Sequence, residues 1–141
     1  MMTKKMILDT GPLVAYIDKS DRFHDWATEI WQQIPMPLFT CEAVISEACF
    51  LLRKTYGGKE AVMSLVKAGI IEFPFRFSEE VERIDELMKQ YRSVPMSFAD
   101  SCLVRMSELI SGSSILTLDR DFQIYRKNRN EAIALLISDE L

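Results

Sequence analysis

The chain has 141 residues, of which 48% are hydrophobic, and its formal net charge is −4. This length and apolar content predict one globular domain over residues 1–141, while no apolar run matches a membrane helix or the core of a secretory signal, so we expect a cytoplasmic protein. The negative charge excludes a general nucleic-acid coat but is compatible with an enzyme that acts on nucleic acid through an acidic site.

The first half of the chain alternates short apolar runs with amphipathic stretches. An apolar run over residues 6–8 ends at Asp9, and Gly11-Pro12 then opens a short helix, because proline is favoured in a first helical turn. A second helix is expected from residues 20–21 to 34. A strand over 38–40, an amphipathic helix over 41–55 and a further helix after the glycine pair 57–58 complete this half.

The second half continues the alternation. Strands are expected over residues 70–73, 115–118 and 134–137, and helices from 78 to 88 and from 97 to 111, with one helical turn over 121–125. Strands separated by helices are typical of βαβ units. The pattern therefore predicts an α/β fold, a three-layer α/β/α sandwich with a mainly parallel sheet of about five strands.

The three cysteines, Cys41, Cys49 and Cys102, are odd in number and lack CxxC spacing. Each lies in an apolar helical context. This pattern favours buried thiols over a disulfide framework or a zinc site.

Two acids directly follow apolar strands. Asp9 ends the first strand and Asp119 ends the fourth, and ligands of open parallel sheets bind beyond the carboxyl ends of the strands. Aspartate is also common in turns and helix caps, so either acid alone has an ordinary structural explanation. Two together favour a site.

Glu47 has an unusual position on its predicted helix. It lies at the edge of the apolar stripe formed by Val44, Ala48 and Leu51, whereas Glu42 is roughly 160° from Val44 and faces solvent. An unpaired carboxylate beside the core costs several kcal/mol and therefore needs a partner. A metal ion is the simplest partner, and a cation from elsewhere in the fold is the alternative.

Asp100 lies three residues after Ser97, in a pattern that fits either a capping box or a site residue. Asp121 is a reserve candidate that would supply a fifth oxygen or cap a turn. Thr10 and Thr117 flank the strand-end acids and are placed to hydrogen-bond a carboxylate or a metal-bound water.

Carboxylates without neighbouring histidine or thiolate are the ligands that Mg²⁺ and Mn²⁺ prefer. Such ions lower the pKa of water and neutralise charge on a phosphoryl oxygen, so the expected chemistry is phosphodiester hydrolysis by a metal-activated water. A late basic cluster would steer a phosphate backbone toward the acids or else form a solvated loop. The cluster consists of Arg120, Arg126, Lys127 and Arg129.

Four segments, in this order, resemble the acid motifs of a PIN domain across essentially the whole chain. They are residues 9–14 (DTGPLV), 40–48 (TCEAVISEA), 96–101 (MSFADS) and 116–122 (LTLDRDF).

The resemblance implies a Mg²⁺- or Mn²⁺-dependent endoribonuclease. Small members of the family are typically VapC-like toxins of toxin–antitoxin pairs, often homodimeric and inhibited by an antitoxin protein that inserts into the acidic groove. Carried over to this chain, the resemblance assigns metal binding and catalysis to Asp9, Glu47, Asp100 and Asp119, with Thr10 and Asp121 in support.

Three other functions remain open on sequence alone. One is a PIN nuclease of RNA processing that is not a toxin. The second is an aspartyl phosphatase with Asp9 as the nucleophile, although no second aspartate follows two residues later. The third is a non-catalytic module that binds metal or a basic partner. The RNA cut, the number of metals and the dimer surface are not specified by an acid quartet.

Overall fold

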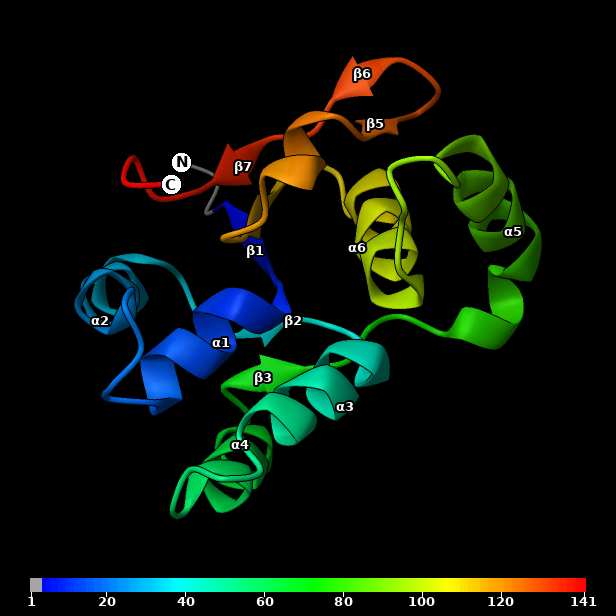
Figure 1. Cartoon of the computed structure of the whole chain (residues 1–141). Coiled ribbons are helices and arrows are strands. Elements are labelled where there is room, and N and C mark those ends of the chain that lie inside the picture. The colour runs from blue at the N-terminus through cyan, green and yellow to red at the C-terminus, as the bar shows by residue number, and fades with distance from the viewer. Residues whose placement is uncertain (1–3) are drawn as a thin grey trace.

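Five short parallel strands form the central sheet of the computed structural model, which describes residues 4–141 (Figure 1). The strand order is β3-β2-β1-β4-β7, and every pairing in this sheet is parallel. Residues 1–3, which entered the argument against a secretory signal, lie outside the described range. The strands are β1 (Lys5–Leu8), β2 (Leu38–Phe39), β3 (Ile71–Glu72), β4 (Ser113–Leu116) and β7 (Leu135–Leu136).

The longest pairing joins β1 to β4. Lys5 pairs with Ser113 and Leu8 with Leu116, so both strands end at the same level of the sheet. All of β4 and all but the first residue of β1 are buried. Because the register is fixed by this burial, the residues that follow the two strands must meet at one edge.

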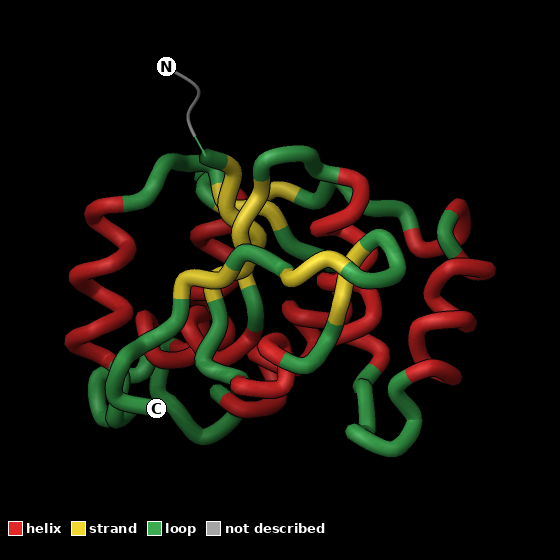
Figure 2. Tube along the Cα trace, turned by 90° about the horizontal axis from the view of Figure 1, so that it is seen from above, coloured by secondary structure: helices red, strands yellow, loops and turns green. Residues whose placement is uncertain are grey.

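Helices cover both faces of the sheet. The connections from β1 through β2 to β3 run one way across the sheet, and the connection from β3 to β4 runs back, so right-handed crossovers place their helices on opposite faces. Figures 1 and 2 show α1 and α2 on one side and α5 and α6 on the other. The predicted three-layer α/β/α fold is confirmed. The helices are α1 (Thr10–Ile17), α2 (His24–Gln33), α3 (Glu42–Leu51), α4 (Gly58–Lys67), α5 (Val81–Gln90) and α6 (Phe98–Leu109), with a 3₁₀ turn η1 (Phe77–Glu79) before α5.

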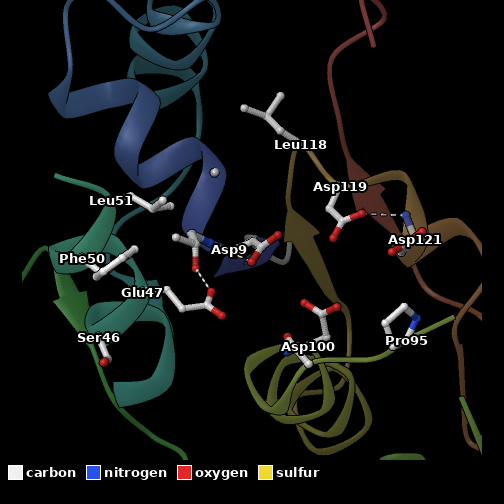
Figure 3. Close-up of a pocket in the computed structure, with 13 residues that line it drawn as sticks. Asp9, Ser46, Glu47, Phe50, Leu51, Pro95, Asp100, Leu118, Asp119 and Asp121 are labelled. Atoms are coloured by element: carbon white, nitrogen blue, oxygen red, sulfur yellow. Dashed lines mark hydrogen bonds between the residues drawn. The ribbon is translucent and has the colours of Figure 1, made fainter. Parts of the chain in front are cut away.

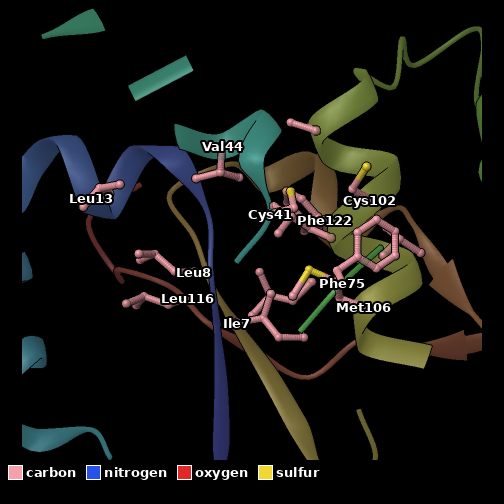
Figure 4. Packing of buried hydrophobic residues seen from close by; sticks show 14 of the residues in the cluster. Ile7, Leu8, Leu13, Cys41, Val44, Phe75, Cys102, Met106, Leu116 and Phe122 are labelled. Atoms are coloured by element: carbon pink, nitrogen blue, oxygen red, sulfur yellow. The ribbon is translucent and has the colours of Figure 1, made fainter. Parts of the chain in front are cut away.

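The core lies between the sheet and these helices. Ile7 and Leu8 of β1 are fully buried and belong to one cluster with Met106 of α6 (Figure 4). Cys41 and Cys102 are buried in the same cluster, Cys49 is half-buried, and all three are free thiols. The prediction of buried thiols without a disulfide is therefore confirmed for two of the three.

The region after β4 differs from the prediction. A 3₁₀ turn, η2 (Arg120–Gln123), is followed by an antiparallel hairpin of β5 (Arg126–Lys127) and β6 (Glu131–Ala132), where no strand was predicted. Asn128 and Arg129 have positive φ angles of 48° and 78°. Positive φ matches the twist of a tight hairpin, and asparagine adopts it readily, so Asn128 was the available signal.

The helix predicted over 41–55 ends early, at Leu51. The next residue, Leu52, is fully buried, and its Cβ would lie 3.0 Å from a Cβ on Gly58. The chain folds back tightly here, and a glycine is needed for that approach. None of the helices within residues 4–141 is long and apolar enough to cross a membrane.

Candidate active site

A groove of about 720 Å³ opens where β1 and β4 end (Figure 3). The strand order reverses between these two strands, and such switch points are where open parallel sheets bind ligands. All five acids that the sequence singled out line this groove: Asp9, Glu47, Asp100, Asp119 and Asp121.

Asp9 lies at the floor of the groove and is 6% exposed. It caps α1, where its Oδ1 accepts a hydrogen bond of 2.7 Å from the backbone N–H of Thr10. Its Oδ2 accepts a second hydrogen bond of 2.7 Å from the hydroxyl of Thr117. The register of β1 with β4 causes this contact, because the N–H of Asp9 also donates to the carbonyl of Leu116.

The environment raises the pKa of Asp9 to about 7. Burial is the main cause, because it disfavours the charged form. The hydrogen bonds from Thr117 and Thr10 oppose this effect, and the negative charges of Asp100 and Asp119 add to it. The acids therefore repel one another.

Thr117 connects two of the acids. Its hydroxyl donates to Asp9 and accepts a hydrogen bond of 2.9 Å from the backbone N–H of Asp119. Asp119 in turn caps η2, with its Oδ1 accepting a hydrogen bond of 2.9 Å from the N–H of Asp121. The prediction that Thr117 hydrogen-bonds a carboxylate is confirmed.

Glu47 is held from α3 by Thr10, whose hydroxyl donates to its Oε1 at 2.7 Å. The carboxylate is not beside the core, as its helical position suggested, but exposed. Leu51, assigned to the inward stripe, is also exposed. The apolar stripe of α3 is narrower than predicted. Val44 and Ala48 face the core, whereas Glu47, Leu51 and their neighbours face the open groove.

Asp100 begins α6. The hydroxyl of Ser97 accepts a hydrogen bond of 3.0 Å from its backbone N–H, which confirms the predicted cap. Its Oδ2 accepts a hydrogen bond of 2.9 Å from the hydroxyl of Tyr125. Burial raises the pKa of Asp100 and the hydrogen bond from Tyr125 opposes this shift. Tyr125 was not predicted as a site residue, since only the folded chain brings it to α6.

The basic residues contribute little to the groove itself. None of the four lines it. Nη1 of Arg126 donates to three backbone carbonyls, those of Gln123, Ile124 and Tyr125, at 2.7–3.3 Å, and thereby stabilises the turn before the hairpin. Arg120 is exposed next to Asp119, and Lys127 and Arg129 lie on the hairpin.

The groove therefore has an unbalanced charge. Its lining holds five carboxylates and no lysine or arginine, and across residues 4–141 none of the five acids forms an ion pair. Carboxylate oxygens of this kind suit a hard divalent cation. As their side chains stand, no three candidate ligands among the described residues converge closely enough to hold one ion. The fit of a divalent cation to this groove thus rests on the carboxylate oxygens and on the absence of lysine and arginine from its lining.

The groove wall also contains side chains that sequence reasoning did not assign to the site. Ser46, Phe50 and Leu51 project from the same face of α3 as Glu47 (Figure 3). Phe50 is 61% exposed although it is a large apolar residue. Its place one helical turn after Glu47 was the signal available in the sequence.

Residues 6–128 match the family model of the PIN domain, and the chain therefore belongs to the PIN domain family. Among curated proteins it is similar to Ribonuclease VapC26 of Mycobacterium tuberculosis (strain ATCC 25618 / H37Rv), with 26% identity over 117 residues, 82% of this chain and 87% of that protein. The crystal structure of Mycobacterium tuberculosis VapC20, described as a sarcin-ricin loop cleaving toxin, matches with a TM-score of 0.70 at 20% identity, over 85% of this chain and 94% of that one. The predicted VapC-like PIN fold is confirmed.

Proposed function

We propose that this chain is an endoribonuclease that depends on Mg²⁺ or Mn²⁺ and hydrolyses RNA phosphodiester bonds, as the toxin of a toxin–antitoxin pair. One observation carries the proposal: five carboxylates share a groove at the sheet's switch point that contains no protein cation. The family membership and the ribonuclease relative support the same activity.

The acids and the residues around them have different roles in this proposal. Asp9, Glu47, Asp100 and Asp119 would hold the ion, with Asp121 in reserve, and a divalent ion bound there would activate a water and neutralise charge on the phosphoryl group. Asp9 is fixed by two hydrogen bonds and gives the site a rigid floor. Thr10 and Thr117 orient carboxylates from opposite sides, and Arg120 at the rim is placed to contact the RNA backbone.

Two observations disfavour the phosphatase alternative with Asp9 as the nucleophile. No second aspartate follows two residues after Asp9. The match to the PIN domain model and the ribonuclease relative support a nuclease instead.

The partners follow from the same proposal. Acting on cellular RNA, the protein would work in the cytoplasm, and the resemblance to VapC-like toxins implies a homodimer and an antitoxin that covers the acid groove. A basic or metal-bridging segment of the antitoxin would complement the five carboxylates of the groove.

Incubation of the purified protein with total cellular RNA tests the activity. Cleavage is expected with Mg²⁺ or Mn²⁺, no cleavage in EDTA, and at least about a hundredfold loss in Asp100→Asn or Asp119→Asn. Glu42→Gln, an exposed acid at the start of α3 that does not line the groove, is the matched control. Metal binding by calorimetry without cleavage of any RNA would instead identify a non-catalytic module.

A further inference from the structure

The acid groove has one feature that metal binding does not use: an exposed aromatic ring in its wall. Phe50 lies in the last turn of α3 and is 61% exposed. It lines the same groove as Asp9 and Asp100 (Figure 3). A solvent-exposed phenylalanine buries its apolar surface only when something packs on it. Because Phe50 and the acids line one groove, a ligand that occupies the groove would contact both the acids and the ring.

One face of this ring already carries a positive charge. The guanidinium of Arg53 lies over the Phe50 ring, with its Cζ 4.0 Å from the ring centroid. Its Nη1 donates a hydrogen bond of 2.8 Å to the Phe50 carbonyl, which fixes the guanidinium in place. Arg53 therefore adds a cation at the rim of a groove whose lining has none.

An RNA strand needs such a contact here. Five carboxylates repel the phosphates of the strand, and a divalent cation bound among them would attract only the phosphate beside it. Stacking of a base on an aromatic ring does not depend on charge balance, and arginine beside the ring adds an attraction for phosphate. A base paired within a duplex has both faces covered by its neighbours, so only an unpaired base can stack on a side chain.

We infer that Phe50 is a stacking platform for one unpaired base of the RNA, with Arg53 contacting a neighbouring phosphate. This inference rests on the proposed ribonuclease function and adds to it a residue that positions an unpaired nucleotide of the substrate. Phe50 is a positioning residue that holds the strand over the acids. The Phe50 ring with Arg53 over it favours RNA over a protein partner, because a nucleotide presents a flat apolar face and an anion together.

Binding measurements test the inference without requiring cleavage. The probe is a fluorescently labelled single-stranded RNA of mixed sequence, titrated with Asp100→Asn protein in Mg²⁺ so that the RNA stays intact. Adding Phe50→Ala should raise the dissociation constant by about tenfold. Phe50→Trp should retain the affinity and Phe50→Leu should not, because leucine keeps an apolar contact but cannot stack.

Tyr56→Ala is the matched control. Tyr56 is a fully exposed aromatic residue that follows α3 but does not line the groove, so its removal should leave the affinity unchanged. An RNA series with a single abasic position completes the experiment. At the stacked position the effect of Phe50→Ala should disappear, and on a fully paired duplex of the same sequence it should be absent throughout.

The outcomes separate this inference from the proposed function. If wild-type protein cuts RNA but Phe50→Ala binds and cuts as well as wild type, the stacking platform is wrong while the ribonuclease stands. If no RNA is cut but single-stranded RNA binds through Phe50, the platform stands and the ribonuclease fails. Equal affinity of the leucine and tryptophan variants would indicate a general apolar contact, such as that of a protein partner, and would overturn the inference.

Discussion

Two buried carboxylates in this molecule have opposite surroundings. Glu108 of α6 has a side chain that is 2% exposed and bonds to Arg83 at 2.7 Å and to Arg105 at 3.1 Å. Asp9, in the groove, is also buried but has only neutral hydrogen-bond donors and further acids around it.

The pKa values of the two acids move in opposite directions. Burial alone would raise the pKa of Glu108, but the hydrogen bonds from Arg83, the Asn128 N–H and Arg105 hold it below its usual value. Burial raises the pKa of Asp9, and the charges of other acids raise it further. Burial does not distinguish a structural acid from a site acid. The distinction lies in whether the fold supplies the counter-charge.

The largest effect is expected from breaking the arginine cluster. Glu108→Gln removes the charge that two partly buried arginines share, and should lower the free energy of unfolding by about 2–4 kcal/mol in urea titrations. Glu86→Gln, which removes an exposed partner of Arg83 at 3.7 Å, should change it by less than about 0.5 kcal/mol. Equal stability of the two variants would show that Glu108 is not a structural acid.

Removing the charge of Asp9 from the groove should change the free energy of unfolding in the opposite direction. The folded-state pKa of Asp9 lies above its unfolded value of 3.8, so its contribution to stability falls as pH rises from about 4 to about 7. In EDTA, Asp9→Asn should therefore stabilise the protein, with a gain that grows by about 2 kcal/mol between about pH 5 and pH 8. Unfolding titrations at both pH values provide the measurement. A variant whose gain does not depend on pH would contradict the raised pKa.

A divalent cation should supply what the groove lacks. Mg²⁺ or Mn²⁺ at about tenfold over its dissociation constant should raise the free energy of unfolding of the wild type by about 1.4 kcal/mol. Glu108→Gln should retain this gain, because Glu108 lies outside the groove and pairs with arginines rather than with a metal ion. Asp9→Asn should lose most of it. Thermal unfolding with and without EDTA is the measurement, and equal gains in both variants would remove the contrast between the two regions.

The smallest effect concerns the hydrogen bond that Tyr125 donates to Asp100. Tyr125→Phe removes a hydrogen bond that lowers the pKa of Asp100, so this pKa should rise further. A carboxyl titration by NMR measures it. Tyr91→Phe is the control, because Tyr91 accepts a hydrogen bond from the Arg126 N–H and does not contact the acid. A similar shift in both variants would point to a general loosening of the hairpin.

The sequence predicted the parts of the site that depend on local signals. Asp9 follows β1 directly and Asp119 lies three residues after the end of β4, and the parallel sheet brings such positions to one edge whatever the details of packing. The cap of α6 by Ser97 is equally local. These features needed only the order of strands and helices.

The remainder depends on contacts that no local pattern encodes. The prediction for Glu47 assumed that the helix face around it would be covered, but the groove leaves it open. Tyr125 reaches Asp100, and Arg83 reaches Glu108, across 25 residues in each case. Periodicity reports which side chains are apolar, whereas these pairings depend on how the helices pack against one another.

The bond between Thr117 and Asp9 joins residues 108 positions apart, and it affects when the site can exist during synthesis. The ribosome makes β1 first, but Thr117, Asp119 and Asp121 emerge only after α6. A growing chain therefore has no complete acid set, and neither has a fragment that stops before β4. The proposed ribonuclease therefore gains a safeguard from this order, since it cannot become active until β4 and the segment that follows it have been synthesised.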